Sequence, residues 1–292
     1  MKIRSDWHIH SRNSCDCHGK GLTMAEIADG AARSGITDFG VADHVHSSYN
    51  LPDIAAARGE FVASRPSPRF HFGVEVTCMR RWELAEVASG RHENPVYGIE
   101  GGPDERSFAV DLTDDDVKAH GIEFVIGAVH WARGVRKDRT AIIDNYLHQY
   151  LSLASHPLVD IIAHPWWWNG WYENEDGSYT TEPWFHDFEM IPRSVHDELA
   201  AALIGYGKAV EINPGVLVTR HYPEAWRKQY LEYLGALAAL GVQLAAGSDR
   251  HQRPYENRFE EMEPLLDSVG IRDEDLWRLP PRVERVAGPS MA

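Results

Sequence analysis

Seven short apolar runs recur along the chain, and each ends near a polar residue of a kind that can bind metal. The runs are DWHIH, DFGVADHVH, RFHFGVEV, EFVIGAVH, VDIIAHP, AVEINPG and VQLAAGSDRH. Continuous apolar runs, as opposed to alternating ones, are typical of parallel strands that are covered on both faces. The pattern therefore predicts seven parallel β-strands.

Helical patterns separate several of these runs. The clearest are TMAEIADGAARSG at 23–35, where Thr23 is a candidate N-cap with Glu26 three residues later, and AWRKQYLEYLGALAALG at 225–241; both end at a glycine. Alternating strands and helices predict a parallel sheet, and seven repeats without a break favour a closed barrel over an open sheet. The predicted fold class is α/β, a (β/α) barrel of about seven strands.

Two segments interrupt the strand and helix rhythm. Residues 80–120 are rich in acidic residues and glycine and contain no clear apolar strand, while residues 166–188 combine aromatic, polar and turn residues. Both follow predicted strand ends, so we expect them to lie over the mouth of the barrel as loops or lids. Because the sequence shows no linker between domains, we predict one domain over residues 1–280 with these two insertions, followed by a flexible tail at 281–292.

Composition narrows the class of protein. The 292 residues are 43% hydrophobic and 25% charged, which is ordinary for a globular protein. No tract is long and apolar enough to span a bilayer and the N-terminus lacks the apolar stretch of a signal peptide, which predicts a cytoplasmic protein with no membrane partner. A net charge of -15 without a Lys or Arg cluster argues against nucleic acid as a partner. We expect a small-molecule substrate; the oligomeric state stays open.

Candidate metal ligands follow the predicted strands. In a (β/α) barrel the active site lies at the carboxyl ends of the strands, and residues i and i+2 of one strand point to the same face, as His8 and His10 do. Nine imidazoles and carboxylates exceed what one ion uses, because zinc usually takes four ligands. We therefore predict two or three divalent ions, with zinc, manganese and iron all compatible with such ligands. The candidates are His8, His10, Asp16, His44, Glu75, His130, His164, Asp249 and His251.

The ordered motifs HIH, ADHVH, GVEV, GAVH, AHP and GSDRH resemble those of the PHP family, named for its polymerase and histidinol phosphatase domains. The resemblance spans about 240 residues. It is nearest to the histidinol-phosphatase-like branch, because VIGAVHW, VEINPG and GSDRH followed by RP all resemble motifs of that branch. It implies a distorted (β/α)7 TIM-like barrel with a trinuclear metal site.

The resemblance also implies an assignment of ligands. One ion would be held by His8, His10, Glu75 and Asp249; a second, bridged by Glu75, by His130 and His164; and a third by His44, His251 and a residue of the loop after His10. Many relatives have a histidine six residues after the second histidine, where this chain has Asp16. We favour Asp16 over His18 for that position.

The CDCH stretch at 15–18 has a rival interpretation as a thiolate zinc site. One Cys-x-Cys pair with one histidine supplies at most three ligands, and no second pair exists nearby. The three cysteines, Cys15, Cys17 and Cys78, also make no disulfide framework. We expect reduced thiols that stand beside the metals without binding them.

Several other residues have two interpretations. Asp6 and Asp43 either orient the ligands beside them or are ordinary polar residues at strand ends. The tryptophans at 166–168 either line a substrate pocket or pack within a lid. Arg220 and His221, after the EINPG strand end, are either a phosphate clamp or an exposed pair at a helix start. Histidines without motif support are expected to be ordinary surface or loop residues; they are His46, His71, His148 and His156.

The predicted centre favours phosphate-ester chemistry. A divalent metal lowers the pKa of bound water from about 15.7 to about 7. Three dications outweigh the charges of Asp16, Glu75 and Asp249, and the acidic surface is screened beyond a Debye length of about 8 Å, so the pocket attracts anions.

We therefore predict a metal-dependent phosphatase that cleaves a small phosphomonoester by a metal-bound hydroxide. Glu75, Asp249 and His221 are the catalytic candidates, and Arg220 with His221 the substrate-binding ones. The alternatives are a metallohydrolase acting on an uncharged C–N or C–O bond and a non-catalytic module.

Overall fold

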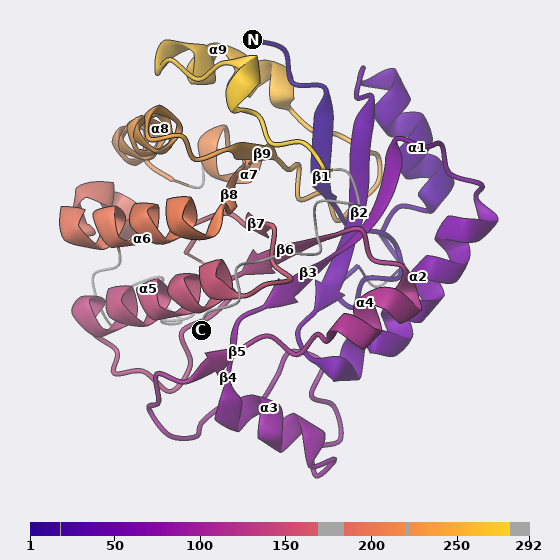
Figure 1. Cartoon of the computed structure of the whole chain (residues 1–292), viewed down its shortest axis with the longest axis horizontal. Coiled ribbons are helices and arrows are strands. Elements are labelled where there is room, and N and C mark those ends of the chain that lie inside the picture. The colour runs from indigo at the N-terminus through magenta and orange to yellow at the C-terminus, as the bar shows by residue number, and fades with distance from the viewer. Residues whose placement is uncertain (18, 169–183, 220–221, 281–292) are drawn as a thin grey trace.

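A computed structural model describes residues 1–17, 19–168, 184–219 and 222–280 of the chain. Its main sheet has seven parallel strands that pair in chain order (Figure 1). They are β1 (Ser5–Ile9), β2 (Asp38–Val45), β3 (Phe70–Thr77), β6 (Phe124–Ala128), β7 (Ile161–Ile162), β8 (Ala209–Ile212) and β9 (Leu244–Ala246). Each strand coincides with one of the seven apolar runs to within one residue, so the predicted α/β barrel is confirmed.

The barrel is nearly closed between its first and last strands. The His10 backbone N–H donates to the Arg250 carbonyl (3.0 Å), and the Asp249 N–H donates to the His8 carbonyl (2.7 Å). These bonds join the end of β1 to the segment after β9. Closure therefore brings the first and last polar motifs of the sequence side by side.

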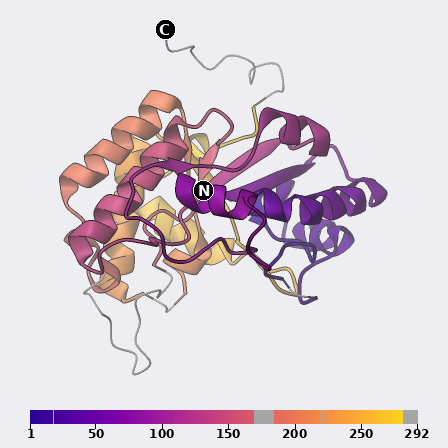
Figure 2. The same ribbon diagram turned by 90° about the horizontal axis from the view of Figure 1, so that it is seen from below.

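Helices form the outer layer on both sides of the strands (Figures 1 and 2). At the start of α1, Thr23 Oγ1 accepts from the Glu26 N–H and the Glu26 carboxylate accepts from the Thr23 N–H, so the predicted capping box is present. Among the described residues no helix has the length and apolar character needed to cross a membrane. The α-helices around the barrel are α1 (Met24–Arg33), α2 (Leu51–Ala63), α4 (Asp114–His120), α5 (Arg139–Ser155), α6 (Arg193–Tyr206), α7 (Pro214–Leu217), α8 (Glu224–Ala239) and α9 (Phe259–Ser268).

The segment predicted as a strandless insertion contains regular structure. The two-residue strands β4 (Met79–Arg80) and β5 (Phe108–Ala109) pair antiparallel, and α3 (Arg81–Ala88) follows β4 and stands apart from the other helices (Figure 1). The expectation that 80–120 holds no strand is therefore wrong. Strands of two residues are too short to carry the periodic pattern by which strands are recognised in a sequence.

Aromatic side chains fill the barrel near the amino ends of its strands. The rings of Trp7 and Phe124 meet edge to face with centroids 5.5 Å apart, and Trp277 packs on Trp7 at 5.0 Å. Gly40 and Gly73 make room for this packing, since a Cβ on either would lie 2.4 Å from the Phe124 ring. These rings fill the barrel interior at the amino end, and the candidate ligands lie at the opposite, carboxyl end.

His71, expected to be an ordinary surface or loop residue, is instead held between two carboxylates at the amino end of β3. Its Nδ1 lies 3.0 Å from Glu123 Oε2 and its Nε2 lies 3.1 Å from Asp38 Oδ1. Burial lowers the pKa of His71, but the hydrogen bonds to Asp38 and Glu123 outweigh it and raise the pKa from 6.5 to about 9. A charged His71 therefore ties the first residues of β2 and β3 to the residue before β6.

This triad predicts a pH-dependent contribution to stability. Because the pKa of His71 is higher in the folded protein, its contribution is fully present below pH 6.5 and is lost as pH rises through about 9. The substitution His71→Leu is expected to lower the free energy of unfolding by about 1.5–3 kcal/mol at pH 6, and by clearly less at pH 9.5. Urea unfolding of both proteins at the two pH values measures the difference; an equal loss at both would contradict the charged triad.

Candidate metal centre at the carboxyl ends of the strands

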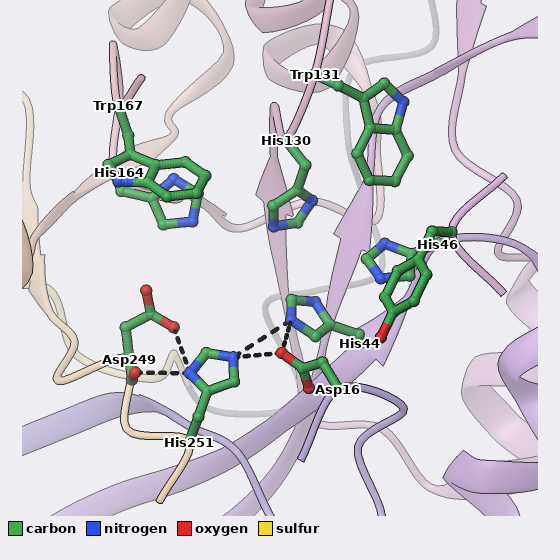
Figure 3. Close-up of a pocket in the computed structure, with 10 residues that line it drawn as sticks. Asp16, His44, His46, His130, Trp131, His164, Trp167, Asp249 and His251 are labelled. Atoms are coloured by element: carbon green, nitrogen blue, oxygen red, sulfur yellow. Dashed lines mark hydrogen bonds and ion pairs between the residues drawn. The ribbon is translucent and has the colours of Figure 1, made fainter. Parts of the chain in front are cut away.

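All nine candidate ligands lie together at the carboxyl end of the barrel. They come from the ends of β1, β2 and β3, from the residues after β6, β7 and β9, and from the loop that follows β1. Most of them line a pocket of about 390 Å³ (Figure 3). Its described lining consists of Asp16, His44, His46, Tyr97, His130, Trp131, His164, Trp167, Asp249 and His251.

Glu75 stands at the centre of this group and is completely buried. Its Oε2 faces three imidazoles, with His8 Nε2 at 3.2 Å, His10 Nε2 at 3.6 Å and His44 Nδ1 at 2.8 Å. Its Oε1 faces two others, with His130 Nε2 and His164 Nε2 both at 3.3 Å. Burial raises the pKa of Glu75, yet the surrounding histidines, His8 and His44 first, hold it well below its usual value. One carboxylate thus presents its two oxygens to two separate groups of histidines.

Asp16, and no cysteine, reaches into the centre from the loop after β1. Asp16 Oδ2 lies 2.8 Å from His251 Nε2 and 3.2 Å from His44 Nε2 (Figure 3). Burial and the nearby charge of Asp16 raise the pKa of the Cys15 and Cys17 thiols, which keeps them protonated at neutral pH. Both cysteines are free, as predicted.

The nine side chains, together with His46, form sets whose ligand atoms lie within 4.8 Å of one another. In a tetrahedral site with bonds of about 2.0–2.1 Å, ligand atoms stand about 3.4 Å apart, so these sets fit a metal ion with little rearrangement. Imidazole nitrogen and carboxylate oxygen suit zinc, manganese and iron. The sets are His10, Asp16, His44 and His251; His8, His10 and Asp249; Glu75, His130 and His164; and His44, His46 and His130.

The histidines of the centre have pKa values shifted in different directions. Burial, with the neighbouring charges of His251 and His44, lowers the pKa of His10 to about 3, so this ring is in the neutral form that binds metal. At His44, burial is outweighed by Glu75 and Asp16, which raise its pKa to about 10. An environment that stabilises positive charge on this ring also stabilises a metal ion beside it.

Backbone strain is concentrated at the same end of the barrel. His164 and Asp249 have positive φ angles of 24° and 52°, a region that residues other than glycine seldom adopt. Such conformations cost about 1–3 kcal/mol each and persist where the surrounding structure enforces them for function. Both side chains contact other candidate ligands, His164 with Glu75 (3.3 Å) and Asp249 with His10 (3.3 Å).

Glu211 is a residue of the centre that our sequence analysis missed. It is buried at the end of β8, where Glu211 Oε1 accepts from His8 Nδ1 (2.6 Å) and Oε2 accepts from the His164 backbone N–H (2.7 Å). With its hydrogen on Nδ1, His8 presents the Nε2 lone pair to Glu75 and Asp249. The signal was available, because Glu211 is the next-to-last residue of the apolar run AVEI, as Glu75 is of GVEV.

Asp6 and Asp43 hold the loops of the centre and do not touch the ligand rings. Asp43 accepts from the N–H and the hydroxyl of Ser11, both at 2.6 Å, at the start of the loop that carries Asp16. Asp6 accepts from the Ser248 N–H (2.9 Å), next to Asp249, and from the Tyr255 hydroxyl (2.7 Å). Their role is to place the segments from which ligands project.

His46, predicted to be an ordinary surface or loop residue, is buried and lines the pocket. Its ring stacks on His44 with centroids 4.7 Å apart, and its Nδ1 lies 2.7 Å from Thr77 Oγ1. The prediction is wrong. β2 ends at Val45, and His46, the next residue, still faces the mouth of the barrel, as the candidate ligands at other strand ends do.

Aromatic side chains form the upper wall of the pocket. Trp131 and Trp167 stand above His130 and His164 (Figure 3), and Tyr97 also lines the pocket. Arg133 contacts two residues of this wall. Its guanidinium lies 4.1 Å from the centre of the Trp131 ring, and its Nη1 donates to the Tyr97 carbonyl (2.6 Å).

The tryptophans at 166–168 divide between the two predicted roles. Trp167 lines the pocket, while Trp166 and Trp168 are buried in the core. The Trp166 backbone N–H donates to the Tyr150 hydroxyl (2.7 Å). Other candidates lie outside the described residues, namely His18, Arg220, His221, most of 166–188 and the tail at 281–292.

Comparisons with known proteins identify the same fold. No protein-family model matches the chain, and no curated protein matches its sequence. Among solved structures, it is similar to a histidinol phosphate phosphatase from Lactococcus lactis that was crystallised with zinc, L-histidinol and phosphate. That likeness has 17% identity and a TM-score of 0.59, and covers 92% of this chain and 94% of the other.

A putative histidinol phosphatase from Listeria monocytogenes is also similar, with 10% identity and a TM-score of 0.52; the match covers 85% of this chain and 95% of that one. At these identities the likeness establishes the fold. The barrel implied by the resemblance to PHP histidinol phosphatases is thereby confirmed.

Proposed function

We propose that this chain is a metal-dependent hydrolase that cleaves small phosphomonoesters at a centre of three divalent ions. The observation that carries the proposal is Glu75, whose two oxygens face two separate histidine groups within one cluster of nine candidate ligands. The shared fold with a phosphatase crystallised with zinc and phosphate supports the substrate class.

The candidate ligands divide into three groups, each of which would hold one ion; we call them the holding groups. His8, His10 and Asp249 form the first with Glu75; His130 and His164 form the second with the other oxygen of Glu75; and Asp16, His44 and His251 form the third. When bound, divalent ions lower the pKa of coordinated water and neutralise phosphoryl oxygens. Glu211 fixes the tautomer of His8, and the aromatic wall limits the access of bulk water.

A second candidate is hydrolysis of an uncharged C–N or C–O bond. The observation that favours it is the absence of Lys and Arg from the pocket lining, as far as that lining is described. Without a cationic side chain, a phosphate dianion would depend on the metal ions and N–H groups. Arg220, which follows α7, is the residue proposed to supply such a contact.

Activity assays on protein purified without chelator distinguish the two candidate functions. We expect it to hydrolyse p-nitrophenyl phosphate and other phosphomonoesters, with inorganic phosphate as a competitive inhibitor. Arg220→Ala should lower kcat/KM by about 10- to 150-fold, the cost of one charge-assisted contact. Arg193→Ala on α6, where the side chain is 93% exposed, is the matched control and should change nothing. Turnover of neutral esters or amides, without turnover of any phosphate or inhibition by it, would reject the phosphatase in favour of the second candidate.

Asp16→Ala is expected to deplete one of the three metal equivalents. Asp16 contributes the carboxylate that lies between His44 and His251, and removing it leaves that group with imidazoles alone. Elemental analysis of the purified variant measures the loss. His18→Ala is the control and should keep full occupancy; the reverse result would move the ligand by two residues.

A further inference from the structure

His46 is a buried side chain of the pocket that the three proposed holding groups do not use. It is 3% exposed, and it follows β2 two residues after His44. Figure 3 shows it on the same side of the pocket as Trp131, with ring centroids 5.3 Å apart. While Nδ1 lies 2.7 Å from the Thr77 hydroxyl, Nε2 is buried and has no hydrogen-bond partner within the described residues.

The Thr77 hydroxyl indicates where the hydrogen of His46 lies. Thr77 Oγ1 is 2.7 Å from Nδ1 of His46 and equally 2.7 Å from Nδ1 of His130. A hydroxyl donates one hydrogen bond and accepts others, so all three groups are satisfied when one ring donates to Thr77 and the other accepts from it. The two histidines therefore carry their hydrogens on opposite nitrogens.

His130 determines the direction of the two hydrogen bonds that meet at Thr77. Its Nε2 faces Glu75 Oε1 at 3.3 Å, in the group proposed to hold a metal. A histidine that binds metal through Nε2 carries its hydrogen on Nδ1, so His130 donates to Thr77. Thr77 then donates to His46 Nδ1, which places the hydrogen of His46 on Nε2. A nitrogen that carries a hydrogen has no lone pair for a metal ion.

We propose that His46 binds substrate and not metal, through a neutral imidazole whose Nε2–H donates to a phosphoryl oxygen. This inference rests on the proposed phosphatase function. A buried N–H without an acceptor is unfavourable, and an anionic oxygen in the pocket relieves it. Since the described lining contains no Lys or Arg, N–H groups are the contacts that this part of the chain offers to an anion.

Three substitutions at one position test the contact. Glutamine extends an amide N–H toward the place of Nε2, whereas asparagine reaches only the place of Nδ1, and leucine offers neither. We expect His46→Leu and His46→Asn to weaken binding of inorganic phosphate, measured by calorimetry, by about tenfold or more. The kcat/KM for p-nitrophenyl phosphate should fall in parallel. His46→Gln should stay within about threefold of the wild type, and all three should keep the wild-type metal content.

Two results would overturn the assignment. Loss of a metal equivalent in His46→Asn or His46→Leu would make His46 a ligand, and unchanged phosphate affinity in both would remove it from the substrate contacts. If the leucine variant fails to fold, comparison of His46→Gln with His46→Asn still tests the contact. A wild type that neither binds phosphate nor hydrolyses a phosphomonoester would overturn the proposed function and this inference together. A wild type that does both, with wild-type behaviour in the variants, would overturn this inference alone.

Discussion

Glu75→Gln is expected to lose metal and to lower kcat by at least about 100-fold. The side chain is completely buried, and its oxygens lie within 3.6 Å of five imidazole nitrogens, which belong to all three holding groups. A neutral amide has nearly the same shape but carries no negative charge, and its nitrogen does not bind cations. The substitution therefore tests charge and bridging with little change in packing. Elemental analysis and steady-state kinetics on the same preparation measure both effects.

The matched control is Glu123→Gln, at the opposite end of the barrel. Glu123 accepts from His71 and from the Phe72 backbone N–H at the amino end, so this variant should keep its metal content and turnover. If Glu75→Gln instead retained near-normal turnover and metal content, Glu75 would not bridge the centre, and the proposed division into three holding groups would fail.

Prolonged chelation is expected to abolish hydrolysis and to lower the melting temperature by at least about 5 °C. The reason is mass action: a ligand at 1,000 times its Kd adds about 4.1 kcal/mol to the free energy of unfolding, and removing it removes that contribution. The untreated protein should contain between two and three equivalents of transition metal per chain. Re-addition of zinc should restore both the melting temperature and the activity.

Glu75→Gln provides an internal control for this experiment. If its centre has already lost metal, chelation should change its melting temperature much less than that of the wild type. A verified metal-free wild-type protein with full activity would end the proposed mechanism, whichever metal the untreated protein contains.

Much of the fold and of the candidate site could be predicted because the relevant patterns are local. Each of the seven strands falls in a continuous apolar run, and the capping box at Thr23 and Glu26 is contained in four residues. The carboxyl ends of parallel strands meet at one end of a barrel. The position of a histidine or carboxylate after an apolar run was therefore enough to predict which side chains would lie together.

The errors about single side chains share an origin in partners that are distant in sequence. His71 is held by Asp38 and Glu123, which are 33 and 52 residues away, and His8 is held by Glu211, which is 203 residues away. His46 depends on Thr77 and Tyr97 from other segments of the chain. Glu211 carries a strand-end signal of its own, but no motif near His8, His46 or His71 shows which distant residue each of them contacts.

The sequence by itself determined the seven strands, the end of the barrel at which the candidate ligands gather and the identity of nine such ligands, because hydrophobic periodicity and strand direction are properties of contiguous residues. Only the tertiary structure decided which oxygen of Glu75 faces which histidines, that Asp16 lies between His44 and His251, and that Thr77 joins His46 to His130. These are contacts between side chains from different strands. Their distances depend on how the barrel closes, and closure is a property of the whole packed chain.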